Sequence, residues 1–522
     1  MPHRIYRTPG VYVKEIGLLP PSIEPIRTAV PAFIGYTPRC ETHGKPYRYE
    51  PTKIASLQEF VRIFGRAHDP EENGSSRPSF HLKPGSSPSS VDLINLHGST
   101  HSILPDAGTI YYLFDSLRLF YDNGGGDAYI VSTGPYGKPD GAPATDPRSI
   151  VNRNVRLSEL QTGLAALESK TEPTLTLCPD AALLSPTENA SLMQSMLQQN
   201  ARTLSAVSIL DVSEGRAPES SSYLNGIAAY RSRVGNQNLS FGLAYYPFLQ
   251  ANVVRADEID ARNLFGGDPS LLEPVLSPPH RPNRDAAKLL GLMTRSSRDP
   301  DLLREYDQKL ESASDAYRQI KAGVREAANR LPPSGAIAGA IVKTDQRRGV
   351  WKAPANIALT SVSGVTINLS SSQQAPLNID PQGGKSINAI RAFSWRGTLV
   401  WGARTLAGND PELRYIPARR TLLFIEQSVD RGLQPFVFKP NDASTWSSIR
   451  NAIEAFLRDL WRDGAFAGYT ERDAFSVRCG LGSTMTAADI SAHRIRIQIA
   501  VALQRPAEFS IISLSLNLRS AP

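Results

Sequence analysis

The stretch LPPSGAIAGAIVKTDQRRGVWKAPAN, residues 331–356, is the most informative part of the chain. A run of small apolar residues leads to Gly349, which suits a tight turn, and Trp351 follows with a large apolar side chain. Pro354 then fixes the direction of the backbone. The same residue types recur farther along the chain, at Trp395, Trp401, Gly402 and Gly408. Together they predict a packed scaffold with a polar rim.

The region before this stretch alternates between strand-like and helical patterns. Its strand-like segments are TLTLCPD (174–180), AVSILDV (206–212) and LSFGLAYYPF (239–248), and SLMQSMLQQNAR (191–202) is one of the helical patterns between them. Such alternation is typical of a parallel sheet with helical connections. We therefore predict an α/β middle domain over residues 151–375.

The strongest helical pattern of the chain lies in residues 301–331. Its apolar residues step by three and four positions, at Leu303, Tyr306, Leu310, Ala313, Tyr317, Ile320, Val324, Ala327 and Leu331. One continuous helix over this stretch would be about 45 Å long. The stripe predicts a helix that packs on its own domain, and an intermolecular coiled coil is the alternative.

A separate N-terminal domain is predicted over residues 26–150. AVPAFIGYT (29–37) reads as a strand, KIASLQEFVRIFG (53–65) as a helix that stops at its glycine, and TIYYLFDSLRLFYDNGGGDAYIV (109–131) as a helix followed by a strand. Residues 66–106 are rich in Gly, Pro, Ser and His, and they cannot bury enough apolar area to fold independently. We expect them to form an exposed, mobile insertion.

An isolated β-prone run, TPGVYVKEI (8–16), precedes that domain. Pro9-Gly10 and Pro20-Pro21 flank it, so it cannot extend a helix and has little local surface to bury. Residues 1–25 are therefore predicted to be a strand arm that completes the sheet of another element. Its candidate strand residues are Val11, Tyr12, Val13 and Ile16.

The last segment, residues 376–522, is predicted to be an α+β domain. A capped helix over 442–464 turns Trp446, Ile449, Ile453, Phe456 and Leu460 inward and leaves an outer stripe, Arg450, Glu454, Arg458 and Arg462. Two alternating strands, 495–503 and 512–518, end the chain, and the RPAEF between them can carry a hairpin turn. The final strand has no obvious local partner, and its candidate residues are Ile512, Leu514 and Leu516.

Bulk composition predicts an ordinary soluble protein of two to four domains. The chain has 522 residues, of which 41% are hydrophobic and 20% charged, and its mean hydropathy is -0.27. The opening MPHRIYRTPG lacks the apolar core of a secretory signal, and the three unpaired cysteines, Cys40, Cys178 and Cys479, fit a reducing compartment. The net charge of +7 is dispersed among acids. We expect assembly in a cytoplasm, no nucleic-acid partner and no insertion into a membrane.

Segments that mimic catalytic or cofactor motifs are incomplete. PQGGKS (381–386) ends like a phosphate-binding loop, but the first required glycine would fall at Ile379. His97 and His101 have metal-compatible spacing without an acid or cysteine partner. We therefore predict no catalytic residue, no metal and no cofactor, and the chain is not expected to be an enzyme.

Several segments together resemble the contractile tail sheath family of bacteriophages, R-type pyocins and extracellular injection systems. In the second half of the chain they are the 331–356 stretch, INAIRAF (387–393), VWGARTL (400–406), LRYIPARR (413–420), VFKPND (437–442) and RPAEF (505–509). Upstream they are TPGVYVKEI, AVPAFIGYT, FYDNGGGDAYIV (120–131) and YYPF (245–248). The resemblance covers nearly the whole chain, except for the insertion at 66–106 and the helix at 301–331. It implies a subtilisin-like middle domain without protease residues, a C-terminal sheath core over 376–522, and terminal arms that exchange strands with neighbouring subunits.

The function implied by the resemblance is that of a structural subunit. Copies would polymerise helically in six-fold discs around an inner tube protein and contract to drive the tube through a membrane, with the energy stored in a metastable extended lattice. Baseplate, cap and paralogous sheath proteins would be further partners, in a phage tail or a released extracellular particle. The outer stripe of the 442–464 helix is a candidate tube-facing surface, and a solvated outer face is the alternative. A hydrolase on the subtilisin-like domain and a tube or baseplate component are the other functions to consider.

Overall fold

The computed structural model describes residues 22–67, 77–85, 91–296 and 299–506. The chain divides into two compact units, with boundaries at 26/27 and 423/424. We call residues 27–423 the sheet unit, and residues 22–26 with 424–504 the hairpin unit. The predicted boundaries at 150 and 375 were wrong, because strands from all three predicted domains join one sheet.

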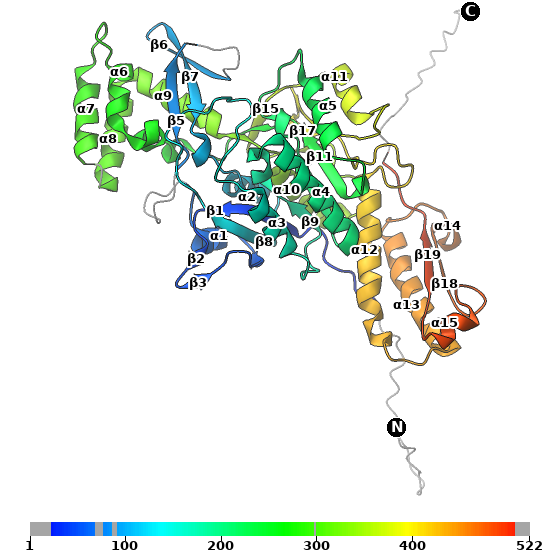
Figure 1. Ribbon diagram of the computed structural model, residues 1–522. Coiled ribbons are helices and arrows are strands. Elements are labelled where there is room, and N and C mark those ends of the chain that lie inside the picture. The colour runs from blue at the N-terminus through cyan, green and yellow to red at the C-terminus, as the bar shows by residue number, and fades with distance from the viewer. Residues whose placement is uncertain (1–21, 68–76, 86–90, 297–298, 507–522) are drawn as a thin grey trace, which may run out of the picture. The chain divides into compact units, whose positions relative to one another are not determined.

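A nine-stranded sheet forms the centre of the sheet unit (Figure 1). In spatial order its strands are β14 (Ile357–Ala358), β17 (Gly397–Val400), β16 (Asn388–Phe393), β11 (Gly242–Tyr246), β10 (Val207–Asp211), β9 (Leu175–Leu177), β1 (Pro31–Thr37), β8 (Ala128–Pro135) and β4 (Thr52–Ile54). The strands from β16 through β8 pair in parallel, and antiparallel strands close both ends. The predicted parallel α/β sheet is therefore confirmed.

Helices cover both faces of this sheet. Phe33 of β1 packs on Phe120 of α2 (Leu113–Asp122), with ring centroids 5.3 Å apart. The next residue, Ile34, contacts Gly163 of α3 (Leu157–Ala165). Successive strand residues point to opposite faces, so α2 and α3 lie on opposite sides. This explains why all of β1 is buried.

The stretch at residues 331–356 contains the helix that covers one of these faces. Helix α10 (Ser334–Arg348) packs against α2, and α4 (Pro186–Thr203) packs against α3. A Cβ added at Gly335 would lie 2.1 Å from the Ser116 carbonyl oxygen, and one at Gly339 would lie 2.5 Å from that of Phe120. Only glycine permits this close approach of two helix backbones. The small residues thus serve helix packing.

The predicted mobile insertion at 66–106 contains regular structure in its described part. Strands β5 (Phe80–Pro84), β6 (Asp92–Leu96) and β7 (Ser99–Pro105) form a three-stranded antiparallel sheet. Its apolar face is buried by α9 (Asp315–Ala328), where Gly323 contacts Ile103 and Ile94. The prediction of an exposed, mobile segment was wrong for these residues, because a helix more than two hundred positions away covers them.

The predicted continuous helix at 301–331 is also corrected. It is two helices, α8 (Pro300–Ala313) and α9, separated at Ser314. The Ser314 hydroxyl accepts a hydrogen bond from the Tyr317 N–H at 3.2 Å and so caps a new helix. Most of the apolar stripe is still buried, with Leu310, Ile320 and Val324 each at 0% exposure, whereas Ala313 beside the break is exposed. The helices therefore pack on their own unit, as predicted.

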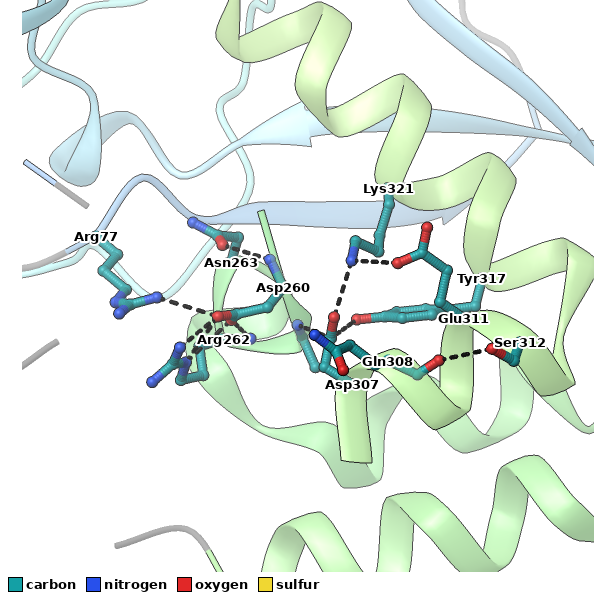
Figure 2. A network of polar contacts seen from close by, with 11 residues as sticks. Arg77, Asp260, Arg262, Asn263, Asp307, Gln308, Glu311, Ser312, Tyr317 and Lys321 are labelled. Carbon is teal, nitrogen blue, oxygen red and sulfur yellow. Dashed lines mark hydrogen bonds and ion pairs between the residues drawn. The ribbon is translucent and has the colours of Figure 1, made fainter. Parts of the chain in front are cut away.

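A largely buried polar cluster, with Glu311 at its exposed edge, holds α8 and α9 together (Figure 2). The Tyr317 hydroxyl donates to Asp307, and the Lys321 ammonium donates to Asp307 and Glu311, at 2.8 Å each. Residues ten and fourteen positions apart would be separated by about 15 and 21 Å along one straight helix. Their contact therefore requires the bend at Ser314.

The remaining elements of the sheet unit surround this framework. They are α1 (Leu57–Phe64), α5 (Tyr223–Arg233), α6 (Glu273–Leu276), α7 (Arg284–Arg295), α11 (Ser371–Asn378), β2 (Glu41–Thr42), β3 (Lys45–Pro46), β12 (Leu249–Ala251), β13 (Arg330–Leu331) and β15 (Val362–Val365). Helix α12 (Ile416–Leu433) runs across the boundary between the units. Among the described residues, no helix combines the length and apolar character needed to cross a membrane.

The hairpin unit is built around one long helix and a small sheet. Its elements are the last part of α12, α13 (Ala443–Arg462), α14 (Glu471–Ala474), β18 (Phe475–Cys479), α15 (Ala487–Ser491) and β19 (Ile497–Val501). Within residues 22–506 as far as the structure describes them, this sheet contains β18 and β19. The partner of the 495–503 strand in the described residues is thus β18, and residues 512–518, the other half of the predicted hairpin, lie outside them.

Candidate assembly surface

Helix α13 confirms the predicted capped helix of the C-terminal region. The Asp442 side chain accepts a hydrogen bond from the Thr445 N–H at 2.8 Å, which satisfies a donor at the first turn. The inward residues Ile449, Ile453, Phe456 and Leu460 are all buried. The helix therefore presents its opposite face, with the predicted outer stripe, to the surroundings of the unit.

The outer stripe of α13 is neutralised within the chain. Arg450 Nε lies 4.0 Å from Glu454 Oε1, and Arg458 Nε lies 2.7 Å from Glu471 Oε1. Arg462 Nη1 lies 3.8 Å from Asp459 Oδ1. The side chains of the stripe are between 34% and 66% exposed. The hydrogen bond between Arg458 and Glu471 raises the pKa of Arg458 and lowers the pKa of Glu471. The surface is therefore a hydrated, charge-balanced face.

The β18–β19 sheet packs one face on α13. Phe475, Val477 and Cys479 of β18 are buried, while Ser476 and Arg478 between them are exposed. Beyond the pairing of β18 with β19, an isolated bridge joins Phe466 to Leu503. In the part of the chain that the structure describes, no further strand pairs with the outer edges of this sheet.

The other predicted site residues lie outside the described residues. They are Val11, Tyr12, Val13 and Ile16 at one end, and Ile512, Leu514 and Leu516 at the other. Their roles stay predictions.

The loop that mimics a phosphate site binds its own carboxylate. Asp380 accepts hydrogen bonds from the backbone N–H groups of Gln382 and Lys385, each at 3.2 Å. These contacts and the nearby Arg231 lower the pKa of Asp380, although burial works in the opposite direction. The backbone donors that a phosphate would need are thus already engaged.

Two buried carboxylates in the sheet unit were not singled out from the sequence. Asp180 accepts backbone hydrogen bonds from Tyr36, Tyr112 and Leu113, and Asp211 accepts one from Ser334 at 2.8 Å. Burial raises the pKa of Asp180 to about 6 and that of Asp211 to about 7. Both side chains tie a helix or loop start to a strand end. Among the described residues, no group of three metal-ligating side chains is present.

Three exposed aromatic side chains were missed by sequence reasoning. Trp395, Phe438 and Tyr469 are 97%, 102% and 100% exposed. The expectation that Trp395 adds to a packed scaffold was wrong, because this residue lies in the turn between β16 and β17 and its side chain is not covered by the sheet unit. Fully exposed aromatics are more common at protein–protein contacts than elsewhere on a surface.

Comparison with known proteins matches this architecture to tail sheaths. A family model described as the phage tail sheath C-terminal domain matches residues 408–516. The chain is similar to the tail sheath protein of Vibrio phage KVP40, with 26% identity over 130 residues, and to that of Burkholderia phage BcepMu, with 30% identity over 148 residues. These alignments cover 25% and 27% of this chain but only 19% and 31% of the phage proteins.

Solved structures match over almost the whole chain. A chain of the anti-feeding prophage (AFP) helical sheath in the contracted state has 26% identity and a TM-score of 0.58, covering 98% of this chain and 100% of that one. This chain is thus similar to contractile tail sheath proteins over almost its whole length. A chain of the 6-fold symmetrised AFP baseplate matches over the same shares, with 26% identity and a TM-score of 0.57. A chain of the PVC sheath complex in its contracted state shares the fold, at 23% identity and a TM-score of 0.59, over 99% of both chains.

The proteins that this chain resembles are structural proteins. They are tail sheath proteins of phages and sheath chains of extracellular contractile injection systems, and they are not enzymes.

Proposed function

We propose that this sheath subunit polymerises helically around an inner tube and contracts to drive the tube through a target membrane. The observation that carries the proposal is the incomplete sheet of the hairpin unit. A two-stranded sheet is marginally stable alone, and its edges present unpaired backbone groups. In the described residues, β18 and β19 form such a sheet on α13.

The terminal arms would supply the strands that this sheet lacks. Residues 11–16 and 512–516 carry strand patterns, with Val11, Tyr12, Val13 and Ile16 at one end and Ile512, Leu514 and Leu516 at the other. Adding a strand to an exposed edge uses backbone hydrogen bonds, which tolerate rigid-body movement of the domains they join. Arms donated to neighbours would therefore keep subunits tied together during contraction.

Donation of arms from one copy to the next gives a heterologous contact. Such contacts generate rings when the rotation closes and helices when it does not. The similarity to a chain in a 6-fold symmetrised baseplate and to a chain in a contracted helical sheath supports stacked six-fold discs. The stroke would draw on a metastable extended lattice and need no nucleotide or other cofactor.

The outer stripe of α13 is our candidate for the tube-facing surface. Arg450, Arg458 and Arg462 already have carboxylate partners in this chain. An acidic tube surface would exchange partners with them rather than meet unpaired charges, so each contact would be weak and reversible. A sheath must hold its tube and then slide past it, and weak contacts suit that task.

Other parts of the proposal rest on the family alone. The parallel sheet would correspond to the subtilisin-like domain, without a protease site. Baseplate, cap and paralogous sheath proteins would be partners beside the tube protein, and the particle would be assembled in a bacterial cytoplasm before release or as a phage tail.

Electron microscopy of purified protein tests the proposal. The full chain is expected to form hollow tubes at high concentration, and a chain that stays monomeric under those conditions contradicts it. Deletion of residues 1–18, or Val11→Pro with Val13→Pro, should abolish tubes while circular dichroism shows a folded protein, because proline removes ladder donors. Val11→Thr with Val13→Thr is the matched control. Threonine retains the backbone N–H and a high strand propensity, so tubes should persist.

A further inference from the structure

The described chain begins with a short segment that is fixed to helix α12. In residues 22–26, Ile23 is 6% exposed, whereas Ser22, Glu24 and Pro25 are exposed. One buried side chain thus anchors an otherwise solvated segment. It lies immediately after the predicted strand arm, so it sets the point from which the arm departs.

The anchor has a socket on α12. A Cβ built at Gly432 would lie 2.7 Å from Cγ1 of Ile23, so any larger residue would displace that side chain. The Ser428 hydroxyl accepts a hydrogen bond from the Ile26 N–H at 3.1 Å, and Ser428 itself is fully buried. Glycine within a helix costs about 1 kcal/mol relative to alanine, so its presence indicates a packing requirement. Here that requirement is room for Ile23.

We propose that Ile23, Gly432 and Ser428 form a clamp that fixes the tether length of the N-terminal arm, and that this length governs how tightly subunits assemble. The inference rests on the proposed function, in which that arm adds a strand to a neighbouring subunit. All three residues belong to the hairpin unit. The arm is therefore attached to the same unit that carries β18 and β19.

The maximum length of the tether is set by the number of residues between the predicted strand and the clamp. Between Ile16, the end of the predicted strand, and Ile23, the chain can span at most about 25 Å. Without the clamp, the next backbone hydrogen bond is at Val30, whose N–H donates to the Thr174 hydroxyl at 3.1 Å. The tether would then reach about 50 Å, twice as far. Effective concentration falls as about the three-halves power of tether length, so the arm would bind about threefold less well.

A switchable clamp gives the sharpest test. The Cβ position at Gly432 lies 3.0 Å from the Cβ of Ile23, so Ile23→Cys with Gly432→Cys can form a disulfide after a shift of less than about 1 Å. The variant is made with Cys40→Ser, because Cys40 is the half-buried one of the three native cysteines. We expect the critical concentration for tube formation, measured by sedimentation, to be about threefold lower in the oxidised than in the reduced protein.

A second pair of variants separates tether length from damage to the fold. Ile23→Ala with Ser428→Ala should raise the critical concentration about threefold, and seven Gly/Ser residues inserted after Gly17 in an otherwise native chain should do the same. Circular dichroism should show unchanged secondary structure in both. Equal critical concentrations for the oxidised and reduced proteins would overturn the clamp. In that case the protein lacking residues 1–18 tells the two proposals apart. If it also assembles normally, the proposed strand arm is wrong. If it does not assemble, the strand arm stands and the clamp alone is wrong.

Discussion

The two sheets of this protein differ in how much of their stability is internal. The nine-stranded sheet has helices on both faces and antiparallel strands at both ends, and buried ion pairs lie among the elements around it. The β18–β19 sheet has one helix on one face and, among the described residues, no further strand at its edges. If neighbouring subunits donate strands, as we propose, the second sheet would be stabilised by them more than the first. Assembly should therefore depend on the hairpin unit and monomer stability on the sheet unit.

The largest expected effect comes from breaking a buried ion pair in the sheet unit. Arg420 and Asp345 form a pair of parallel hydrogen bonds at 2.8 and 2.6 Å, and their side chains are only 4% and 3% exposed. Asp345→Ala leaves a buried guanidinium without its carboxylate, which should cost about 3–5 kcal/mol of unfolding free energy. Urea unfolding of the monomer measures this loss.

The matched control is Glu454→Ala on α13. It removes the partner of Arg450, a pair whose side chains are 42% and 34% exposed and 4.0 Å apart. Exposed pairs contribute less than about 1 kcal/mol, so the unfolding free energy should barely change. Similar losses for the two variants would mean that the sheet unit is no more self-contained than the hairpin unit.

A second prediction concerns pH and the buried Asp211. Its pKa of about 7 lies above the ordinary value of 3.8 because burial disfavours the charged form. The folded protein therefore keeps this proton at pH values where the unfolded chain has lost it. Stability from this group is full below about pH 4 and is lost as the pH rises toward 7, by an amount on the order of 4 kcal/mol.

Asp211→Asn should remove that pH dependence. An asparagine oxygen can still accept the hydrogen bond from the Ser334 N–H, and it carries no charge at any pH. The stability difference between variant and native protein should grow in favour of the variant between pH 4 and 8. Asp140→Asn, at an exposed position, controls for the loss of one carboxylate. A parallel pH profile for native protein and Asp211→Asn would contradict the assignment.

Local patterns in the sequence predicted several elements of both units. The apolar spacing and the Asp442 cap predicted α13, and alternating strand and helix patterns predicted the parallel sheet. The helix predicted at 53–65 is present from Leu57 to Phe64 and ends at Gly65, which has a φ of 83°, but Lys53 and Ile54 belong to strand β4. Each of these signals depends on residues close together in the chain.

Contacts between distant segments could not be predicted in this way. The strands of residues 80–105 contain too little apolar surface to fold alone, and the helix that covers them begins at Asp315. The bend at Ser314 had a local signal, a serine followed by an aspartate, but the unbroken apolar stripe outweighed it. The Gly432 socket for Ile23 has no sequence signal at all, since the two residues are four hundred positions apart.

The smallest expected effect on monomer stability, and the most direct test of the hairpin unit, is charge reversal on the outer stripe. Arg450, Arg458 and Arg462 lie on the face of α13 opposite its buried residues. Changing all three to Glu should leave the circular dichroism spectrum and the unfolding midpoint nearly unchanged, because exposed charges contribute little. If this face meets the tube, the same variant should fail to assemble around it. Reversing three charges changes the net charge of each subunit by six units, at a contact that every subunit repeats. Reversal of Arg304, Lys309 and Arg318 on α8 and α9 is the matched control, with the same charge change on exposed helices of the sheet unit. Co-sedimentation with the tube protein should therefore be lost for the α13 variant and kept for the control. Equal binding by both would identify the stripe as a solvated face and leave tube contact to another surface.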